Sequence, residues 1–136
     1  PTYRSVIEAS RVVRRESVAD GIVAAAREIA EATNIKAICC FSQTGNTAAL
    51  VARERPHVPI IAFSPNVAAL RAMNLYWGIV PREMPQITDL DQLVDWATAD
   101  LMGAGLASPG ERVVMVFGAP IGVRGTTNSI RVHVIK

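Results

Sequence analysis

Six polar or small residues stand in a row after a short apolar stretch: Ser42, Gln43, Thr44, Gly45, Asn46 and Thr47. Three of them carry hydroxyls, and Gly45 lets the backbone turn tightly. If a helix begins next, its first amides point outward with a partial positive charge, and with the hydroxyls they would hold a phosphate. The segment lacks the lysine and the glycine spacing of a nucleoside triphosphate P-loop. The alternative is a turn followed by a helix cap, a role that Asn and Thr favour without any ligand.

A second candidate segment runs from Gly118 to Asn128 and contains two further glycines, Gly122 and Gly125, together with Arg124. Such a segment can close over an anion, and Arg124 would bring a permanent, forked positive charge to a phosphate. The alternative is a wide hairpin connection in which the glycines relieve backbone strain and Arg124 is solvated.

No catalytic constellation is visible in the sequence. No Ser, Cys or Thr forms a recognisable nucleophile motif with a His, and no paired carboxylates have metal-binding spacing. Cys39 and Cys40 are adjacent, so their side chains should face opposite sides of a strand. His57 lies beside prolines in an expected surface turn, and His133 lies on an expected edge strand as an exposed residue. We therefore predict no catalytic residue, metal site or cofactor in this chain.

Apolar periodicity predicts the elements that must position these segments. Helices are expected at Val18 to Ala32, at Ala48 to Arg53, from about Asn66 through Met73, and after Thr88. Ser17 and Asp20 form a capping box for the first of these helices, and Thr88 with Asp91 caps the last. Strands are expected at Ala37 to Phe41, Pro59 to Phe63, Gly78 to Pro81, Arg112 to Phe117 and Ser129 to Ile135.

Strands that alternate with helices imply a mainly parallel sheet, because parallel neighbours need crossover connections. We expect an α/β fold, a three-layer α/β/α sandwich with a mainly parallel five-stranded sheet. The connection before the last strand has no helical period, so this strand should pair antiparallel at a sheet edge. In it Ile130, Val132 and Val134 alternate with polar residues, which predicts one wetter face. Trp77 and Trp96 are expected to be packing anchors.

The composition fits one compact domain. The chain has 136 residues, of which 50% are hydrophobic and 19% charged, and we assign residues 1–136 to a single domain with residues 1–15 as a helix or connecting arm.

The net charge of +2 comes from charges scattered along the chain, so no basic stripe suits nucleic acid. Apolar runs fall far short of the ~20 residues that span a membrane. We expect a cytoplasmic protein without nucleic-acid or membrane partners.

Several short motifs follow one another along the chain. They are Ser17 to Ile22 at the start of an alanine-rich helix, Lys36 to Ile38, Ser42 to Ala48, Arg55-Pro56, Pro59 to Ala62, Leu75 to Pro81, Gly110 to Val114, Gly118 to Asn128 and Ile130 to Ile135. In this order, over nearly the whole length, they resemble the C-terminal domain of pyruvate kinase. Each motif is weak alone, but the ordered series is specific.

The resemblance implies a glycolytic phosphotransferase that moves a phosphoryl group from phosphoenolpyruvate to ADP, with Mg²⁺ and usually K⁺, as a homotetramer. Its active site lies in a separate barrel domain outside this chain, so the isolated chain should be inactive. The resemblance assigns to this chain allosteric regulation and a subunit contact. The residues that it implies for the effector phosphate are Ser42, Gln43, Thr44, Gly45, Asn46 and Thr47, with Gly122, Arg124 and Gly125 in the loop that folds over the effector.

The identity of the effector stays open. Gln43 and Asn46 replace basic residues found in some members that are activated by fructose 1,6-bisphosphate, and the loop with Gly122 and Gly125 is closer to bacterial enzymes. A sugar phosphate or a nucleotide monophosphate such as AMP is therefore a candidate beside the bisphosphate.

Two functional interpretations remain. The chain is either a fragment of a catalytic pyruvate kinase, which a start at Pro1 rather than Met favours, or a free-standing phosphate-binding module without catalysis. A hydrolase on the same scaffold is a third possibility, because a fold alone does not determine function.

Overall fold

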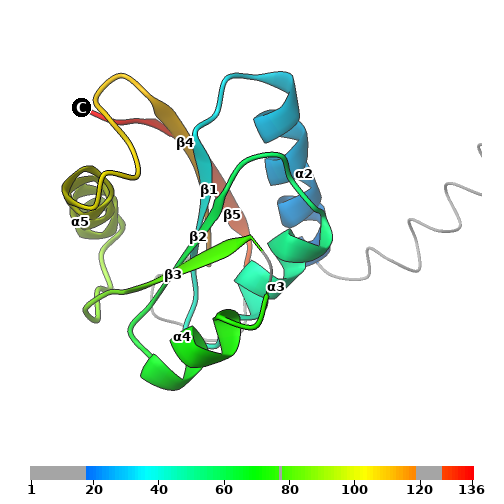
Figure 1. Ribbon diagram of the computed structural model, residues 1–136, viewed down its shortest axis with the longest axis vertical. Helices are drawn as coiled ribbons and strands as arrows, with labels where there is room; N and C mark the ends of the chain where they lie inside the picture. The colour runs from blue at the N-terminus through cyan, green and yellow to red at the C-terminus, as the bar shows by residue number, and fades with distance from the viewer. Residues whose placement is uncertain (1–17, 77, 119–126) are drawn as a thin grey trace, which may run out of the picture.

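A computed structural model describes residues 18–76, 78–118 and 127–136. Its elements, in chain order, are α2 (Val18–Ala32), β1 (Ala37–Phe41), α3 (Asn46–Arg53), β2 (Ile60–Ser64), α4 (Val67–Met73), β3 (Ile79–Glu83), α5 (Leu90–Gly103), β4 (Arg112–Phe117) and β5 (Ser129–Val134). Their arrangement can be followed in Figure 1.

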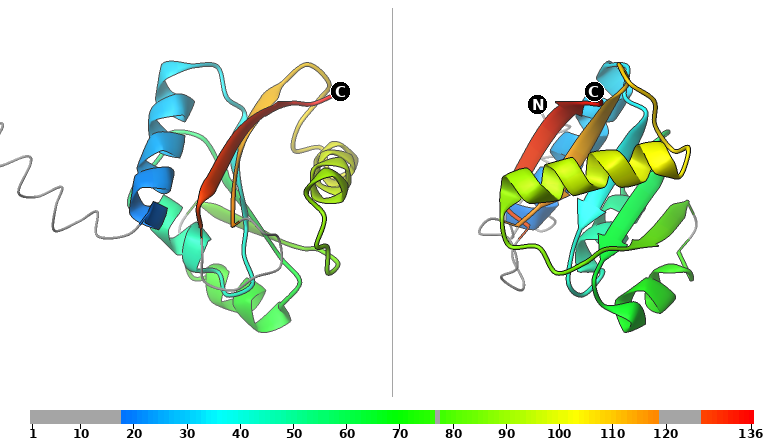
Figure 2. Two further views of the ribbon diagram at one scale, coloured as in Figure 1. Left: turned by 180° about the vertical axis from the view of Figure 1, so that it is seen from behind. Right: turned by 90° about the vertical axis from the view of Figure 1, so that its left-hand side faces the viewer.

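The strands form one five-stranded sheet in the order β3-β2-β1-β4-β5. The first four are parallel, and β5 pairs antiparallel with β4 at the edge. Helices α2, α3 and α4 pack on one face and α5 packs on the other. Figure 2 shows α5 crossing its face of the sheet with α2 behind. The predicted three-layer α/β/α sandwich with an antiparallel last strand is confirmed.

An aromatic contact anchors the layer between the sheet and α5. Phe41 of β1 and Phe63 of β2 are register partners whose rings stack with centroids 5.0 Å apart. Trp96 of α5 meets Phe63 edge-on at 5.6 Å. Such geometries add to the stabilisation that comes from burial alone. The prediction that Trp96 is a packing anchor is confirmed, whereas Trp77 and the capping residue Ser17 lie outside the described residues.

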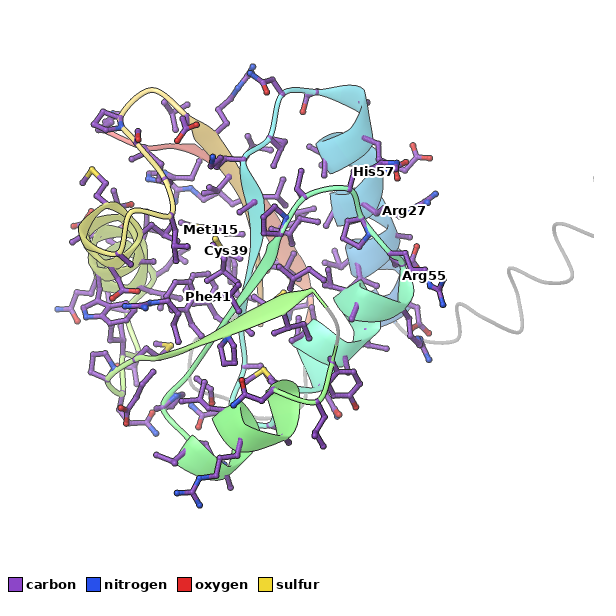
Figure 3. The ribbon with its side chains drawn as sticks, viewed as in Figure 1. Arg27, Cys39, Phe41, Arg55, His57 and Met115 are labelled. Atoms are coloured by element: carbon purple, nitrogen blue, oxygen red, sulfur yellow. The ribbon has the colours of Figure 1, made fainter. Side chains whose placement is uncertain are left out.

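Small side chains bring α2 close to the opposite face of the sheet. Val23, Ala26 and Ala30 are its buried residues and belong to the core on that face. The two cysteines divide between the faces as predicted: Cys39 lies on the α5 side and Cys40 on the α2 side. Figure 3 shows Cys39 with Phe41 and Met115 between the sheet and α5, while Arg27, Arg55 and His57 lie beyond the opposite face.

Several predicted element ends were wrong. Strands β2 and β3 both extend beyond their predicted ends, because hydrogen bonding between them continues to the pairing of Ser64 with Glu83. The cap of α5 is Asp89 rather than Thr88, since an oxygen of Asp89 accepts a hydrogen bond from the amide of Gln92 at 3.0 Å. Asp and Thr are both good caps, so the sequence did not distinguish these neighbours.

The last strand lacks the single wetter face that its alternation predicted, because Arg131 on one face and Val132 and Val134 on the other are all exposed. Val132 and Val134 have 46% and 44% of their surface exposed, because the helices on the α2 side cover Ile130 but not the residues beyond it. On the other face His133 is half-buried against α5, with Nε2 3.0 Å from Thr98 Oγ1. Thr98 donates its own proton to Val94 O, so Nε2 of His133 is the donor. Burial, followed by the charges of Arg131 and Lys136, lowers the pKa of His133.

In the part of the chain that the structure describes, no helix combines the length and the apolar character that crossing a membrane requires.

The buried cysteines lead to a prediction about reactivity. Burial raises the pKa of Cys39 to about 12 and also raises that of Cys40. Because the thiolate is the reactive form, a disulfide reagent at pH 8 should modify the native chain at least about a hundredfold more slowly than it modifies an exposed cysteine. Both thiols should react fully in guanidinium chloride, which serves as the control. Rapid modification of the native chain would contradict this burial.

Candidate functional site

The first segment singled out in the sequence and the described ends of the second, Gly118 and residues 127–128, lie at the carboxyl edge of the parallel strands. Strands β1 and β4 are neighbours in the sheet, and the connection after β1 leads to β2 on one side whereas the connection after β4 leads to β5 on the other. Ligands of open α/β sheets bind outside the strand ends at such a switch point. Residues 42–47 follow β1, and Gly118 follows β4. The antiparallel β5 begins at the same edge, where the amide of Asn128 donates to Phe117 O at 3.2 Å.

Hydroxyl groups organise the loop after β1. Ser42 Oγ accepts hydrogen bonds from the amides of Thr44 at 3.2 Å and Gly45 at 3.0 Å. Thr44 Oγ1 accepts one from the amide of Asn46 at 3.3 Å. A hydroxyl that accepts from an amide still has its own proton to donate. Ser42 and Thr44 can therefore shape the loop and donate to an anion at the same time.

Gly45 sets the entry to α3. It is the cap residue of this helix, has a left-handed φ of 85°, and provides no side-chain hydrogen bond. The first helical hydrogen bond joins the amide of Ala49 to Gly45 O, so the amides of Thr47 and Ala48 have no acceptor within the helix. Asn46 and Thr47 lie inside α3, which begins two residues before its predicted start, so neither is the cap of this helix. The alternative of a turn followed by a helix cap, without a ligand, stays a prediction.

Neighbouring loops support the same segment. Asn66, the cap of α4, accepts from the amides of Ala68 and Ala69 and donates through Nδ2 to Gln43 O at 3.3 Å. The side chain of Gln43 lies 3.4 Å from that of Gln86, which follows β3. Sequence reasoning did not single out Asn66 or Gln86. The signal for Asn66 was its position three residues after the end of a predicted strand, because all parallel strands end at this edge.

Thr47 and Thr127 connect the two candidate segments. Their Oγ1 atoms are 2.6 Å apart, and the two residues are 5% and 9% exposed. The sequence predicted Thr47 as a ligand for phosphate, whereas Thr127 was only part of the second segment. No local pattern could have identified this contact, because the two residues are 80 positions apart. Gly122, Arg124 and Gly125 lie outside the described residues.

The site contains neutral donors. Its described members offer hydroxyls, side-chain amides and the open amides at the start of α3, an arrangement that suits an anion better than a cation. Among residues 18–76, 78–118 and 127–136 there is no group of three His, Cys, Asp or Glu side chains that could hold a metal ion.

Comparisons with known proteins agree on one family. The family model described as pyruvate kinase, alpha/beta domain, matches residues 20–133. A pyruvate kinase of Agrobacterium vitis is 33% identical over 130 residues, which cover 96% of this chain and 27% of that protein. One of Geobacillus stearothermophilus is 32% identical over 134 residues, covering 98% and 23%.

Among solved structures, a pyruvate kinase from Cryptosporidium parvum superposes with a TM-score of 0.79 at 24% identity, covering 88% of this chain and 23% of that one. This likeness shows the fold. The chain spans about a quarter of the length of the curated relatives named above.

The geometry at Gly45 predicts the outcome of a substitution. A Cβ at this position would lie 3.3 Å from Met73 Cγ, and the left-handed backbone costs an alanine about 1 to 2 kcal/mol. Gly45→Ala should therefore lower the free energy of unfolding by at least about 1 kcal/mol, measured by urea denaturation.

Gly21→Ala is the matched control. Gly21 lies in α2, and a Cβ there would have no heavy atom within 4 Å. Alanine has the higher helix propensity, so this variant should be as stable as the wild type or more stable by up to about 1 kcal/mol. Equal stability of Gly45→Ala and wild type would show that the loop does not need its left-handed turn.

Proposed function

The chain belongs to the pyruvate kinase alpha/beta domain family, and we propose that it serves as the C-terminal regulatory domain of such an enzyme by binding a phosphorylated effector. The parent reaction, a step of glycolysis, transfers a phosphoryl group from phosphoenolpyruvate to ADP. In this proposal the catalytic barrel, with its Mg²⁺ and K⁺, belongs to the part of the enzyme outside this chain. The enzyme is a cytoplasmic homotetramer in which this domain contributes subunit contacts.

One observation carries the proposal: the loop after β1 directs several hydrogen-bond donors to one place at the switch point of the sheet. The amides of Thr47 and Ala48 have no helical acceptor, and the hydroxyls of Ser42 and Thr44 accept from the backbone while keeping their own protons. A phosphate dianion has acceptors only, so it complements these donors.

The charge at the site favours one phosphate group over two. The described donors are neutral, and Gln43 and Asn46 provide amides where a bisphosphate site would use cations. We propose that Arg124 supplies the cation and that Gly122 and Gly125 let its segment approach the ligand. A sugar monophosphate or a nucleotide monophosphate fits this balance of charge.

Titration with inorganic phosphate tests the site. In NMR spectra of the wild-type chain, the amide signals of Thr47 and Ala48 should shift with rising phosphate, and AMP should shift the same signals at lower concentration. Thr44→Val removes one donated hydrogen bond to a charged group, worth about 1.5 to 3 kcal/mol, so phosphate should bind at least about tenfold more weakly.

Thr33→Val is the control for the loss of a threonine hydroxyl. Thr33 Oγ1 donates to Ile29 O at 2.7 Å, at the end of α2 and away from the loop, so its phosphate affinity should equal that of the wild type. If the signals of Thr47 and Ala48 do not respond to phosphate, or if Thr44→Val binds as tightly as the wild type, the loop is only a turn.

A further inference from the structure

A buried hydrogen bond joins the loop of residues 42–47, where α3 begins, to the residue two positions before β5. Thr47 belongs to the first turn of α3, and Thr127 precedes β5. Their hydroxyl oxygens are 2.6 Å apart, with 5% and 9% of the two residues exposed. Burying a hydroxyl without a hydrogen-bond partner costs free energy, and the bond between the two threonines removes this cost for both.

The direction of this hydrogen bond decides whether Thr47 can also donate to a ligand. Each hydroxyl has one proton, and in a bond between two hydroxyls only one proton lies between the oxygens. If Thr47 donates to Thr127, it has no proton left for a ligand. If Thr127 donates to Thr47, the proton of Thr47 is free for a phosphate oxygen, which can only accept.

From this constraint we propose that Thr127 is a positioning residue of the phosphate site, an inference that rests on the function proposed above. Its hydroxyl donates to Thr47 Oγ1, holds that side chain in one rotamer and leaves the proton of Thr47 for the anion. A chain of donors from Thr127 through Thr47 to the phosphate is mutually polarised, and the burial of the two threonines strengthens the bond between them.

The same bond fastens the loop to the sheet. Asn128, the next residue after Thr127, donates its amide to Phe117 O at the end of β4. The bond between Thr47 and Thr127 therefore joins the start of α3 to the point where β5 begins.

A double-mutant cycle separates this role from a purely structural one. Phosphate affinity is measured from the Ala48 amide shift in wild type, Thr127→Val, Thr47→Val and the double variant, with thermal unfolding recorded for each. Thr127→Val keeps the shape of the side chain and removes the hydroxyl. It should weaken phosphate binding roughly threefold to tenfold, the range expected for one hydrogen bond, and cause no further loss in the Thr47→Val background.

Thr127→Ser retains the hydroxyl and should bind phosphate as the wild type does, which guards against a variant that merely folds poorly. If Thr127→Ser is as weak as Thr127→Val, the hydroxyl is not responsible. If Thr127→Val weakens binding equally with and without Thr47, it acts through the fold and the positioning role is wrong. If the wild type binds phosphate and Thr127→Val binds it with the same affinity, this inference is wrong while the proposed function stands. The absence of phosphate binding in the wild type overturns the proposed function and this inference together.

Discussion

The pairing of β1 with parallel strands on both sides is the constraint on which the rest of the structure depends. All five residues of β1 are buried, and its partners β2 and β4 run in the same direction. Parallel partners require crossovers, so helices cover both faces, and the carboxyl ends of these strands come to one edge. The loop of residues 42–47 therefore occupies the switch point because of the position of β1 in the sheet. The hydrogen-bond donors of residues 42–47 lie at this switch point because the strand order puts them there.

In the proposed site the described residues would hold an anion by the direction of their hydrogen-bond donors more than by their charge. The start of a helix contributes roughly half an elementary charge, and hydroxyls contribute dipoles without net charge. Such a site recognises the shape of a phosphate well but attracts it weakly over distance, because salt screens the small field within about 10 Å. A cation brought by another segment would add affinity, whereas the loop after β1 would supply selectivity for tetrahedral oxygens. This division explains how the loop can lack lysine and arginine and still suit a phosphate.

The sequence predicted those features that depend on local pattern. The C-terminal end of the long amphipathic helix Val18–Ala32 and both ends of the apolar strand Arg112–Phe117 agree with the structure, since the sequence pattern changes sharply at these ends. The cap of α5 was misplaced by one residue because Thr88 and Asp89 are both able caps. The exposure of Val132 and Val134 on β5 was not predicted, because alternation reveals two faces but not which neighbour covers them. The contact of Thr47 with Thr127 could not be predicted, since it depends on how β5 returns to the edge where α3 begins.

The most direct test of the central claim is a crystal structure of the chain in complex with AMP or glucose 6-phosphate. The account predicts that the phosphate group lies at the start of α3, with oxygens within hydrogen-bond distance of the amides of Thr47 and Ala48 and of the hydroxyls of Ser42 and Thr44. A phosphate group bound elsewhere on the chain, with these amides and hydroxyls making no contact to it, would contradict the account.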